Sequence, residues 1–517
     1  MKLSVVLIAL LTLITRIWSV DQVPPHLSND EISIAYDAYS LAFSGKDEHG
    51  KTRPLAFESH GTYKAPLYAY VLVPLERIWG NNEVVARLPS IIAGIITVWL
   101  VGLIALKLTG NSWIGLMASG VLAVTPAHIM TSRMVLEANL ALMFLAIGIY
   151  LVLDKKWIWG IISLVISMYA YHTEWLFVPM LVLITGKIFI KRNVFYLAMI
   201  GLMIVLVSPL AVDYLKNSGA GARAKSEVIW REARLEEELK NVNYLAGGLK
   251  IAKVFFQNYL GYFNPGYLFF NGLNLLPKDN PFQPGVFLWP LIVPMIIGLT
   301  KLKMVIKKDK LIFFISWIIL SPVVASLTHG GPNLLRNLNS LLPLSIVISV
   351  GLVSMLKTGK LIIGSVTIIS LIMFLITYYK IYPIEMAESF QGYKPIAQYL
   401  KKEIKSKSKK VYIDYRYGNY ATGRGQEYIG VPHLYFGFYN RWDPSIIQNR
   451  IDEKDGVHFD KYVVGQVDWN NIEINNNYYY VVAIGNTPSK EKIEKLSLVM
   501  VFNDASGKKA FELWKGR

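Results

Sequence analysis

Long apolar stretches alternate with short polar ones from the start of the chain to about residue 379. A helix needs about 20 apolar residues to cross the roughly 30 Å hydrocarbon core of a bilayer, and many of these stretches approach that length. The pattern predicts eleven membrane-spanning helices, near residues 2–20, 84–106, 112–128, 134–153, 157–171, 175–190, 194–211, 285–302, 311–328, 338–356 and 361–379. The predicted fold class is therefore a polytopic α-helical membrane protein.

The same pattern divides the chain into two domains. Residues 1–380 are predicted to form the transmembrane domain, with two longer outer loops at 21–83 and 212–284. The apolar run 66–79 in the first loop predicts a re-entrant or interfacial helix. Residues 381–517 are soluble in character and predict an extracytoplasmic α/β domain. Its expected elements are a helix at 396–405 and strands at 411–415, 478–484 and 496–502.

Composition agrees with a membrane protein. Hydrophobic residues make up 53% of the 517 residues and charged residues only 17%, whereas soluble chains are about 25% charged. The mean hydropathy is +0.37. In a membrane protein, the net charge of +17 indicates that basic residues gather in cytoplasmic loops, next to anionic lipid headgroups. It does not indicate a nucleic-acid partner. The absence of cysteine excludes disulfides and thiolate chemistry.

Basic residues mark alternate connections between the predicted spans. These connections hold thirteen basic residues against two acids, Asp154 and Asp309. The basic residues are Lys107, Lys155, Lys156, Lys187, Lys191, Arg192, Lys301, Lys303, Lys307, Lys308, Lys310, Lys357 and Lys360. The positive-inside rule makes these connections and the N-terminus cytoplasmic in a cell-membrane protein. The first apolar segment can also be interpreted as a cleaved signal peptide, although no small-x-small cleavage site follows it. Residues 21–83 and the C-terminal domain lie outside in either case.

Asp30 and Glu31 follow the first apolar segment by only a few residues. An unpaired charge so close to the bilayer is costly unless it has a function. If the two carboxylates open a helix, its N-terminal dipole stabilises them, and that is the structural alternative. The functional alternative is that Asp30 is a catalytic base, with Glu31 either orienting it or capping the helix.

Several short motifs follow Asp30-Glu31 in a fixed order. They are Tyr63-Lys64-Ala65-Pro66-Leu67-Tyr68, Ala86-Arg87-Leu88-Pro89-Ser90, Ser132-Arg133-Met134-Val135-Leu136-Glu137-Ala138-Asn139 and Tyr171-His172-Thr173-Glu174-Trp175-Leu176-Phe177-Val178-Pro179. The series resembles the membrane glycosyltransferases that use polyprenyl-phosphate sugars, in the protein O-mannosyltransferase and aminoarabinose (lipid A) transferase group. The resemblance covers at least residues 20–190 and implies the GT-C fold. The chain departs from the family pattern at Thr62, Ala65 and Glu174, so no donor sugar or acceptor is carried over from one relative.

The resemblance implies an inverting transferase at the outer leaflet, which moves a hexose or pentose such as mannose. A one-step displacement needs one carboxylate near the incoming hydroxyl, and Asp30 supplies it. Cations must hold the departing phosphate, and Lys64, Arg87, Arg133 and Arg336 are the candidates. The alternative for each of these cations is snorkelling to the membrane interface.

Further candidates have structural alternatives of their own. Tyr63 belongs to the same motif as Lys64 and is a candidate for donor binding. His172 either contacts the phosphate or is satisfied by a backbone carbonyl. Glu137 matches a second acidic position of the family, and it either serves the site or pairs with Arg133 four residues earlier.

The remaining expectations concern cofactors, partners and rival functions. No cofactor is required, although Asp30 and Glu137 are hard oxygen ligands that suit a divalent metal. The partners are a polyprenyl-phosphate-linked sugar, the bilayer and an acceptor that is a protein, a lipid or a glycan. A transporter or flippase of lipid-linked sugars is the first rival function, but such proteins carry charges near mid-span. A non-catalytic membrane scaffold is the second rival.

Overall fold

The structure is a computed structural model, and it describes all residues except 1, 60–61, 217–226, 240–241, 274–282, 386–392, 404–408, 418–427, 430, 454–455 and 505–506. Contacts group the chain into two compact units. The helical unit comprises Met1–Trp18, Leu55–Tyr68 and Leu88–Thr377, and the C-terminal unit comprises Ser19–Pro54, Ala69–Arg87 and Tyr378–Arg517. Much of the predicted loop 21–83 therefore belongs to the same compact unit as the C-terminal residues. The domain boundary predicted between residues 380 and 381 did not include this part of the loop in the C-terminal domain.

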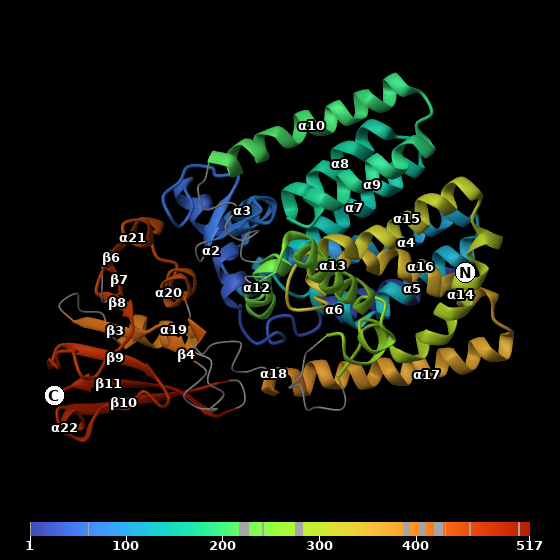
Figure 1. Cartoon of the computed structure of the whole chain (residues 1–517). Helices are drawn as coiled ribbons and strands as arrows, with labels where there is room; N and C mark the ends of the chain where they lie inside the picture. Colours follow the sequence, from blue (N-terminus) through green and yellow to red (C-terminus); the bar gives the residue numbers. More distant parts are fainter. Residues whose placement is uncertain are drawn as a thin grey trace. The chain divides into compact units, whose positions relative to one another are not determined.

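The helical unit follows the apolar pattern closely (Figure 1). Its helices are α1 (Lys2–Ile17), α4 (Glu83–Thr109), α5 (Ser112–Val124), α6 (Pro126–Thr131), α7 (Glu137–Leu153), α8 (Trp157–Ala170), α9 (Glu174–Phe189), α10 (Asn193–Lys216), η1 (Ile229–Arg231), α12 (Ala233–Leu239), α13 (Tyr244–Gly261), η2 (Tyr267–Asn271), η3 (Trp289–Leu291), α14 (Ile292–Val305), α15 (Lys308–Ser326), η4 (Leu335–Ser340), α16 (Leu341–Ser354) and α17 (Lys357–Ile376). A short hairpin, β1 (Phe57–Ser59) and β2 (Thr62–Lys64), completes the unit.

Each predicted apolar segment overlaps one of these helices, namely α1, α4, α5, α7 to α10 and α14 to α17. Among the described residues, five helical stretches are long and apolar enough to cross a membrane. They are Glu83–Thr109, Asn193–Lys216, Lys308–Ser326, Leu335–Ser354 and Lys357–Ile384, and three shorter apolar helices are Ser112–Val124, Glu137–Leu153 and Trp157–Ala170. The chain is thus a multi-pass membrane protein, while the number of eleven spans stays a prediction.

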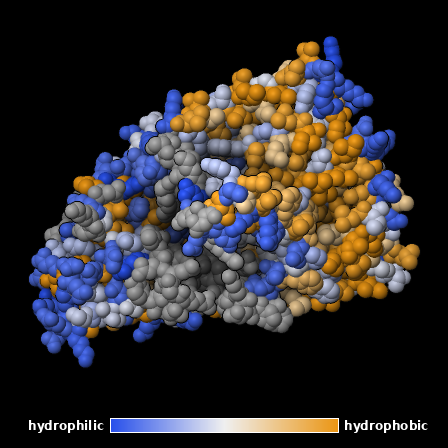
Figure 2. Space-filling view, viewed as in Figure 1, coloured by the Kyte–Doolittle hydropathy of each residue, from blue (hydrophilic) through white to orange (hydrophobic). Residues whose placement is uncertain are grey.

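Apolar side chains cover much of the visible surface of the helical unit (Figure 2). Large ones such as Leu197, Val205, Leu361 and Ile368 are exposed along α10 and α17. A soluble protein rarely leaves so much contiguous apolar surface in water, so these faces are suited to lipid. The visible surface of the C-terminal unit is mainly hydrophilic in the same figure.

The basic connections meet one another in the helical unit. Lys107 Nζ lies 2.6 Å from Asp154 Oδ1, and Lys156 Nζ lies 3.0 Å from Asp154 Oδ2. Lys310 Nζ donates to the Lys107 carbonyl, which brings in a third connection. Three connections predicted to share one side of the membrane therefore do lie together at one end of the helices.

The C-terminal unit is an α/β structure. Its elements are α2 (Asn29–Ser44), α3 (Leu67–Trp79), η5 (Thr377–Ile381), α18 (Tyr382–Glu385), α19 (Tyr393–Glu403), β3 (Lys410–Asp414), β4 (Arg416–Tyr417), β5 (Tyr428–Ile429), α20 (Pro432–Asn440), α21 (Pro444–Gln448), β6 (Ile451–Glu453), β7 (Gly456–Phe459), β8 (Tyr462–Gly465), β9 (Tyr478–Ala483), α22 (Lys490–Ile493), β10 (Leu496–Asn503) and β11 (Lys509–Gly516). Seven strands form one sheet in the order β10-β11-β9-β3-β8-β7-β6. The central strand β3 is parallel to both β8 and β9, and the outer pairs are antiparallel. The predicted strands at 411–415, 478–484 and 496–502 correspond to β3, β9 and β10.

Helix α2 packs directly against α20. A Cβ atom placed on Gly437 of α20 would lie 2.5 Å from Tyr36 Cε2, so the two helices approach at a position that admits only hydrogen. The loop after α2 is held as well, because Arg450 Nη1 donates to Glu48 O at 2.7 Å and Gln448 Nε2 donates to Asp47 O at 3.1 Å. The segment that carries Asp30 is therefore a packed part of the C-terminal unit.

Candidate active site

At the start of α2, the adjacent carboxylates of Asp30 and Glu31 have different surroundings. Ser28 is the N-cap: its Oγ accepts from the Glu31 backbone N–H at 3.4 Å, and Glu31 Oε2 accepts from the Ser28 N–H at 3.0 Å. This reciprocal capping box satisfies two donors that a helix start otherwise leaves unbonded. Glu31 is 1% exposed, whereas Asp30 at the second position of the helix is exposed. Of the two carboxylates, Glu31 therefore does the capping and Asp30 faces outward.

Arg87 holds the loop that leads into α2. Its Nη1 donates to Val20 O at 2.6 Å and to Pro24 O at 3.0 Å, and its Nη2 donates to His26 O at 3.0 Å. Arg87 Nε lies 3.9 Å from Glu31 Oε1, and the Arg87 side chain is completely buried. The guanidinium is thus occupied by three carbonyls and one carboxylate, which favours positioning of the loop over contact with a phosphate or snorkelling.

A second set of contacts fixes the same loop from the C-terminal side of the sequence. Tyr435 OH donates to Leu27 O at 2.7 Å. Glu83 accepts from Lys394 Nζ at 2.7 Å and from Tyr439 OH at 2.7 Å, and its carboxylate lies 3.8 Å from His26 Nδ1. Sequence reasoning missed these residues, because nothing in a single chain signals partners that are 311 to 408 positions apart.

In the helical unit, Lys64 ends strand β2 and is paired across the hairpin with Phe57. Its side chain is buried, with 3% exposed. A lysine is among the residues least often fully buried, because its ammonium loses hydration there. The neighbouring Tyr63 is also buried, and its hydroxyl donates to Glu58 Oε2 at 3.4 Å. Both residues of the motif are therefore buried in the helical unit, and a phosphate-binding role of Lys64 stays a prediction.

Tyr63 and His172 meet at one aromatic cluster. Tyr63 packs edge-on against Tyr214, with ring centroids 6.4 Å apart, and His172 Nε2 lies 2.9 Å from Tyr214 OH. Trp175 closes the cluster at 4.5 Å from Tyr214. The imidazole of His172 thus has a side-chain partner in Tyr214, where the sequence suggested a phosphate or a backbone carbonyl.

The two motifs around Arg87 and Glu137 also come together. Ser90 Oγ accepts from the Leu136 N–H at 3.3 Å, and Asn139 Nδ2 donates to Ser90 O at 2.8 Å. These bonds join α4 to the first turn of α7, where Glu137 is the first residue and is buried with 8% exposed. A carboxylate at this position is stabilised by the helix dipole.

Arg133 does not share a helix with Glu137, because α6 ends at Thr131 and α7 begins at Glu137. The Arg133 side chain is completely buried, and its Nη1 donates to Thr15 O at 3.2 Å near the end of α1. Pairing of the two residues along one helix face is therefore not the arrangement found.

A second buried arginine, Arg16, lies near the same end of α1. It donates to Ala123 O at 3.1 Å and its Nη2 lies 2.9 Å from His128 Nδ1. The sequence motifs do not include Arg16. Its partner His128 is 112 residues away, so no local pattern signals the pair.

Arg336 is held by protein groups. It forms an ion pair with Glu227, and its Nη1 donates to Thr328 Oγ1 at 2.8 Å and to His329 O at 3.2 Å. Glu227 lies 3.8 Å from His329 Nε2 as well. These contacts favour a structural role in the connection between α15 and η4.

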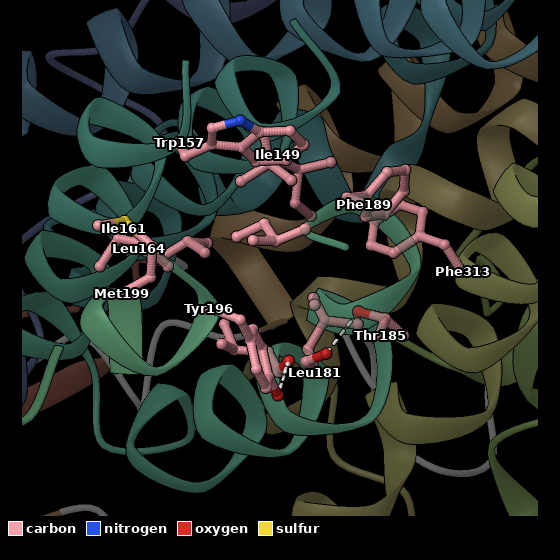
Figure 3. Close-up of a pocket in the computed structure, with 14 residues that line it drawn as sticks. Ile149, Trp157, Ile161, Leu164, Leu181, Thr185, Phe189, Tyr196, Met199 and Phe313 are labelled. Atoms are coloured by element: carbon pink, nitrogen blue, oxygen red, sulfur yellow. Dashed lines mark hydrogen bonds between the residues drawn. The ribbon is translucent and has the colours of Figure 1, made fainter. Parts of the chain in front are cut away.

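The apolar cavity of the helical unit is a separate feature (Figure 3). It has a volume of about 40 Å³ and is lined by side chains that include Trp157, Phe189, Tyr196 and Phe313. Its polar groups turn to the helix backbone, as Thr185 Oγ1 does by donating to Leu181 O at 2.5 Å. None of the predicted site residues is among its described lining residues, so it is not a candidate active site.

The described residues contain no group of three or more His, Asp or Glu side chains arranged to hold a metal ion. Glu31 is engaged with Ser28 and Arg87, as described above. A divalent metal at Asp30 and Glu137 stays a prediction.

Comparisons with known proteins show what this chain is similar to. A family model for dolichyl-phosphate-mannose-protein mannosyltransferase matches residues 6–168, which include Asp30, Lys64, Arg87, Arg133 and Glu137. The resemblance inferred from the sequence motifs is thereby confirmed. A search of curated proteins gives no match.

Among solved structures, the chain is similar to ArnT from Cupriavidus metallidurans. The apo state of that protein matches with a TM-score of 0.56 and 12% sequence identity, over 98% of this chain and 97% of the other. The structure of the same protein bound to undecaprenyl phosphate matches with a TM-score of 0.58 and 12% identity, over the same shares of the two chains. At this identity the likeness defines the fold.

Proposed function

We propose that this chain is an integral-membrane inverting glycosyltransferase that moves a sugar from a polyprenyl phosphate to an acceptor hydroxyl outside the membrane. The family match over residues 6–168 and the fold shared with a protein that binds undecaprenyl phosphate support this class. The observation that carries the proposal is the position of Asp30, an exposed carboxylate beside a capping box made by Ser28 and Glu31. Asp30 stands in the first turn of α2, directly beside the two residues that form this box, and it is not itself a member of the box.

The reaction is a single displacement. The acceptor oxygen forms a bond to the anomeric carbon while the bond from that carbon to the phosphate oxygen breaks, which inverts the configuration. Asp30 takes the proton of the acceptor hydroxyl as the bond forms. The electron pair of the broken bond leaves with the polyprenyl phosphate, and a cation stabilises the charge that develops there.

Lys64 is the candidate for that cation that the family-like motif implies. Its ammonium is buried, and electrostatic attraction to a phosphate is stronger where water is excluded. Arg87 and Arg336 have protein partners in the structure, and they act in this proposal by positioning the loop before α2 and the connection after α15. The sugar is proposed to be a hexose or pentose, and the acceptor a protein, a lipid or a glycan.

The test uses membranes that contain the full chain and radiolabelled polyprenyl-phosphate sugars. Asp30→Asn is expected to reduce label transfer by about 10²–10⁴-fold, the usual contribution of a positioned base. Asp21→Asn is the matched control, because Asp21 is an exposed carboxylate of the same loop. Full transfer by Asp30→Asn would refute the proposed base.

The same variants separate a transferase from a flippase. A flippase moves the lipid-linked sugar across the bilayer without breaking the bond to phosphate. Reconstituted vesicles should therefore show label on the acceptor, and polyprenyl phosphate should be released in equal amount. Movement of intact donor with no released polyprenyl phosphate would favour the flippase.

A further inference from the structure

The C-terminal unit contains a polar cavity at the carboxyl ends of strands β3 and β8. Its volume is about 660 Å³. Tyr415 and Gln466, which both line it, are the first residues after these two parallel strands. Open α/β sheets bind ligands outside the carboxyl ends of their parallel strands, in the crevice at the point where the strand order reverses. Strand β3 lies between two parallel neighbours, β8 and β9.

The lining of this cavity is polar and acidic. It includes three carboxylates, Glu453, Asp468 and Glu473, together with the amides of Gln466 and Asn471. No lysine or arginine is among its described lining residues. The nearby Lys492 turns its ammonium to Ile472 O at 3.1 Å, so that cation is directed to the backbone. Two further groups touch the lining from outside: Lys410 Nζ lies 5.5 Å from the centroid of the Tyr412 ring, and His458 Nε2 lies 3.7 Å from Glu453 Oε2. With three carboxylates against these, the lining itself is acidic and offers many hydrogen-bond acceptors.

The polar floor is held in place by its own contacts. Asp468 Oδ2 accepts from Asn471 Nδ2 at 2.7 Å, and Asp468 Oδ1 accepts from the Asn470 N–H at 3.0 Å. Tyr480 OH donates to Glu473 O at 2.6 Å, which fixes the backbone beside the third carboxylate. Preorganised groups of this kind lose little conformational freedom when a ligand binds.

Two tyrosines add aromatic surface to the same lining. Tyr412 is stacked on Tyr480, with ring centroids 5.6 Å apart and planes at 11°, so its orientation is fixed. Tyr415 is half-buried, and in the described part of the chain no other ring packs against it. Aromatic faces carry partial negative charge and attract the C–H groups of a sugar ring.

We propose that this cavity binds a saccharide that carries no acidic group. Hydroxyl groups donate to the carboxylates and exchange hydrogen bonds with the amides, while Tyr415 supports the ring face. The volume lies within the roughly 300–1,000 Å³ of small-molecule sites and admits one or two sugar units. If the chain transfers sugar as proposed above, this saccharide is part of the acceptor; that last step alone rests on the proposed function.

The experiment titrates the full chain in detergent with neutral disaccharides of gluco, manno and galacto configuration, with a glucosamine disaccharide and with digalacturonate. Binding is measured by saturation-transfer NMR and calorimetry. At least one neutral or amino disaccharide is expected to bind, and digalacturonate at least about tenfold more weakly, since each 1.4 kcal/mol of repulsion is a factor of ten. Binding of none of the neutral or amino probes, or equal binding of digalacturonate, would overturn the proposal.

Variants locate the site and separate it from the membrane reaction. Tyr415→Ala is expected to weaken binding by roughly two- to tenfold, in line with other aromatic contacts. Glu473→Gln is expected to reduce the difference in affinity between the neutral disaccharides and digalacturonate. Loss of structure would weaken the binding of both and would not produce this effect. Glu491→Gln, an exposed carboxylate on α22, is the matched control and should change neither value.

Asp30→Asn is expected to leave saccharide binding unchanged, since Asp30 is not a lining residue of this cavity. Loss of binding in Asp30→Asn, or full binding in a folded Tyr415→Ala and Glu473→Gln double variant, would place the saccharide elsewhere. If Asp30→Asn abolishes sugar transfer but keeps saccharide binding, both the transferase proposal and the saccharide site are supported. If the parent chain transfers sugar but binds none of the saccharides, only the saccharide site is refuted.

Discussion

Glu31 Oε1 lies 3.9 Å from Arg87 Nε, while the other oxygen of the same carboxylate accepts from the Ser28 backbone N–H. One side chain therefore joins the helix start that carries Asp30 to the arginine that holds the preceding loop. Both side chains are buried, so this contact is shielded from solvent and from salt.

Variants at Glu31 separate its two contacts. Glu31→Gln keeps an acceptor for the Ser28 N–H but removes the negative charge beside Arg87, whereas Glu31→Ala removes both. We expect Glu31→Ala to lower the free energy of unfolding by about 2 kcal/mol and Glu31→Gln by about 1 kcal/mol, because lost caps cost 0.5–2 kcal/mol and Arg87 loses its counter-charge. Chemical unfolding in detergent measures both. Transfer should fall far less in Glu31→Gln than in Asp30→Asn, and an equal fall would make Glu31 a catalytic group.

Arg87→Lys tests the positioning role of Arg87. A lysine has one ammonium and cannot satisfy the carbonyls of Val20, Pro24 and His26 at once. Each buried acceptor left without a donor costs about 1–3 kcal/mol, so the melting temperature should fall by several degrees. Thermal-shift measurements check this. A variant that melts like the parent chain but binds polyprenyl phosphate more weakly would instead identify Arg87 as a phosphate ligand.

Arg336→Ala should behave as a structural substitution. Its partner Glu227 is partly exposed, and such ion pairs contribute about 1 kcal/mol or less. We expect transfer to remain within about threefold of the parent value, while Lys64→Met reduces the affinity for polyprenyl phosphate. Donor titrations of the two variants provide the comparison, and the reverse order of effects would contradict it.

The contact between α2 and α20 is sensitive to one methyl group. Gly437→Ala would place Cβ 2.5 Å from Tyr36 Cε2, and such overpacking costs about 1–3 kcal/mol. Tyr36→Leu in the same chain removes the obstructing ring atom and should recover part of the loss. A double-mutant cycle measured by chemical unfolding gives the coupling, and full additivity of the two changes would mean that the helices do not meet there.

Glu76 gives the C-terminal unit a pH-dependent stability. The side chain is fully buried, and in the described part of the chain neither carboxylate oxygen has a hydrogen-bond partner. Burial raises the pKa of Glu76 to about 8, partly offset by Arg441. An unfolded glutamate titrates near 4.3, so between about pH 4.5 and 8 the folded state holds a proton that the unfolded state has lost.

Stability should therefore fall as the pH rises through that window, by at most about 1.4 kcal/mol per pH unit. Unfolding experiments at pH 5, 6.5 and 8 measure the slope. Glu76→Gln keeps the shape of the side chain and removes the titrating group, so its slope should be flatter. Equal slopes for the two chains would show that Glu76 does not titrate in this range.

Hydropathy predicted the helices of the membrane region, because that signal is local. Each predicted apolar segment overlaps a helix, and the strands at β3, β9 and β10 were indicated by runs of β-branched and aromatic residues. Strands β4 to β8 were not predicted, since each has only two to four residues, too few for an alternating pattern to be recognised. Strand β11 was missed as well, although it has eight residues.

The candidate site was predicted in part. The sequence motifs single out Asp30, Lys64 and Glu137, the family match covers these positions, and their roles in a site stay predictions. The sequence could not show that Arg87 faces backbone carbonyls or that Arg336 faces Glu227, because charge alone does not distinguish a ligand-binding arginine from a structural one. Nor could it show that Tyr435 and Glu83 fix the loop before α2.

The bond from Tyr435 to Leu27 spans 408 positions, and that from Lys394 to Glu83 spans 311. Ribosomes add about 5–20 residues per second, so α2 emerges roughly 20–80 s before Tyr435 exists to hold it. During that interval the nascent protein has the carboxylate of Asp30 but not the surroundings that fix its direction. If the chain is the transferase proposed above, its active site is therefore completed only near the end of synthesis.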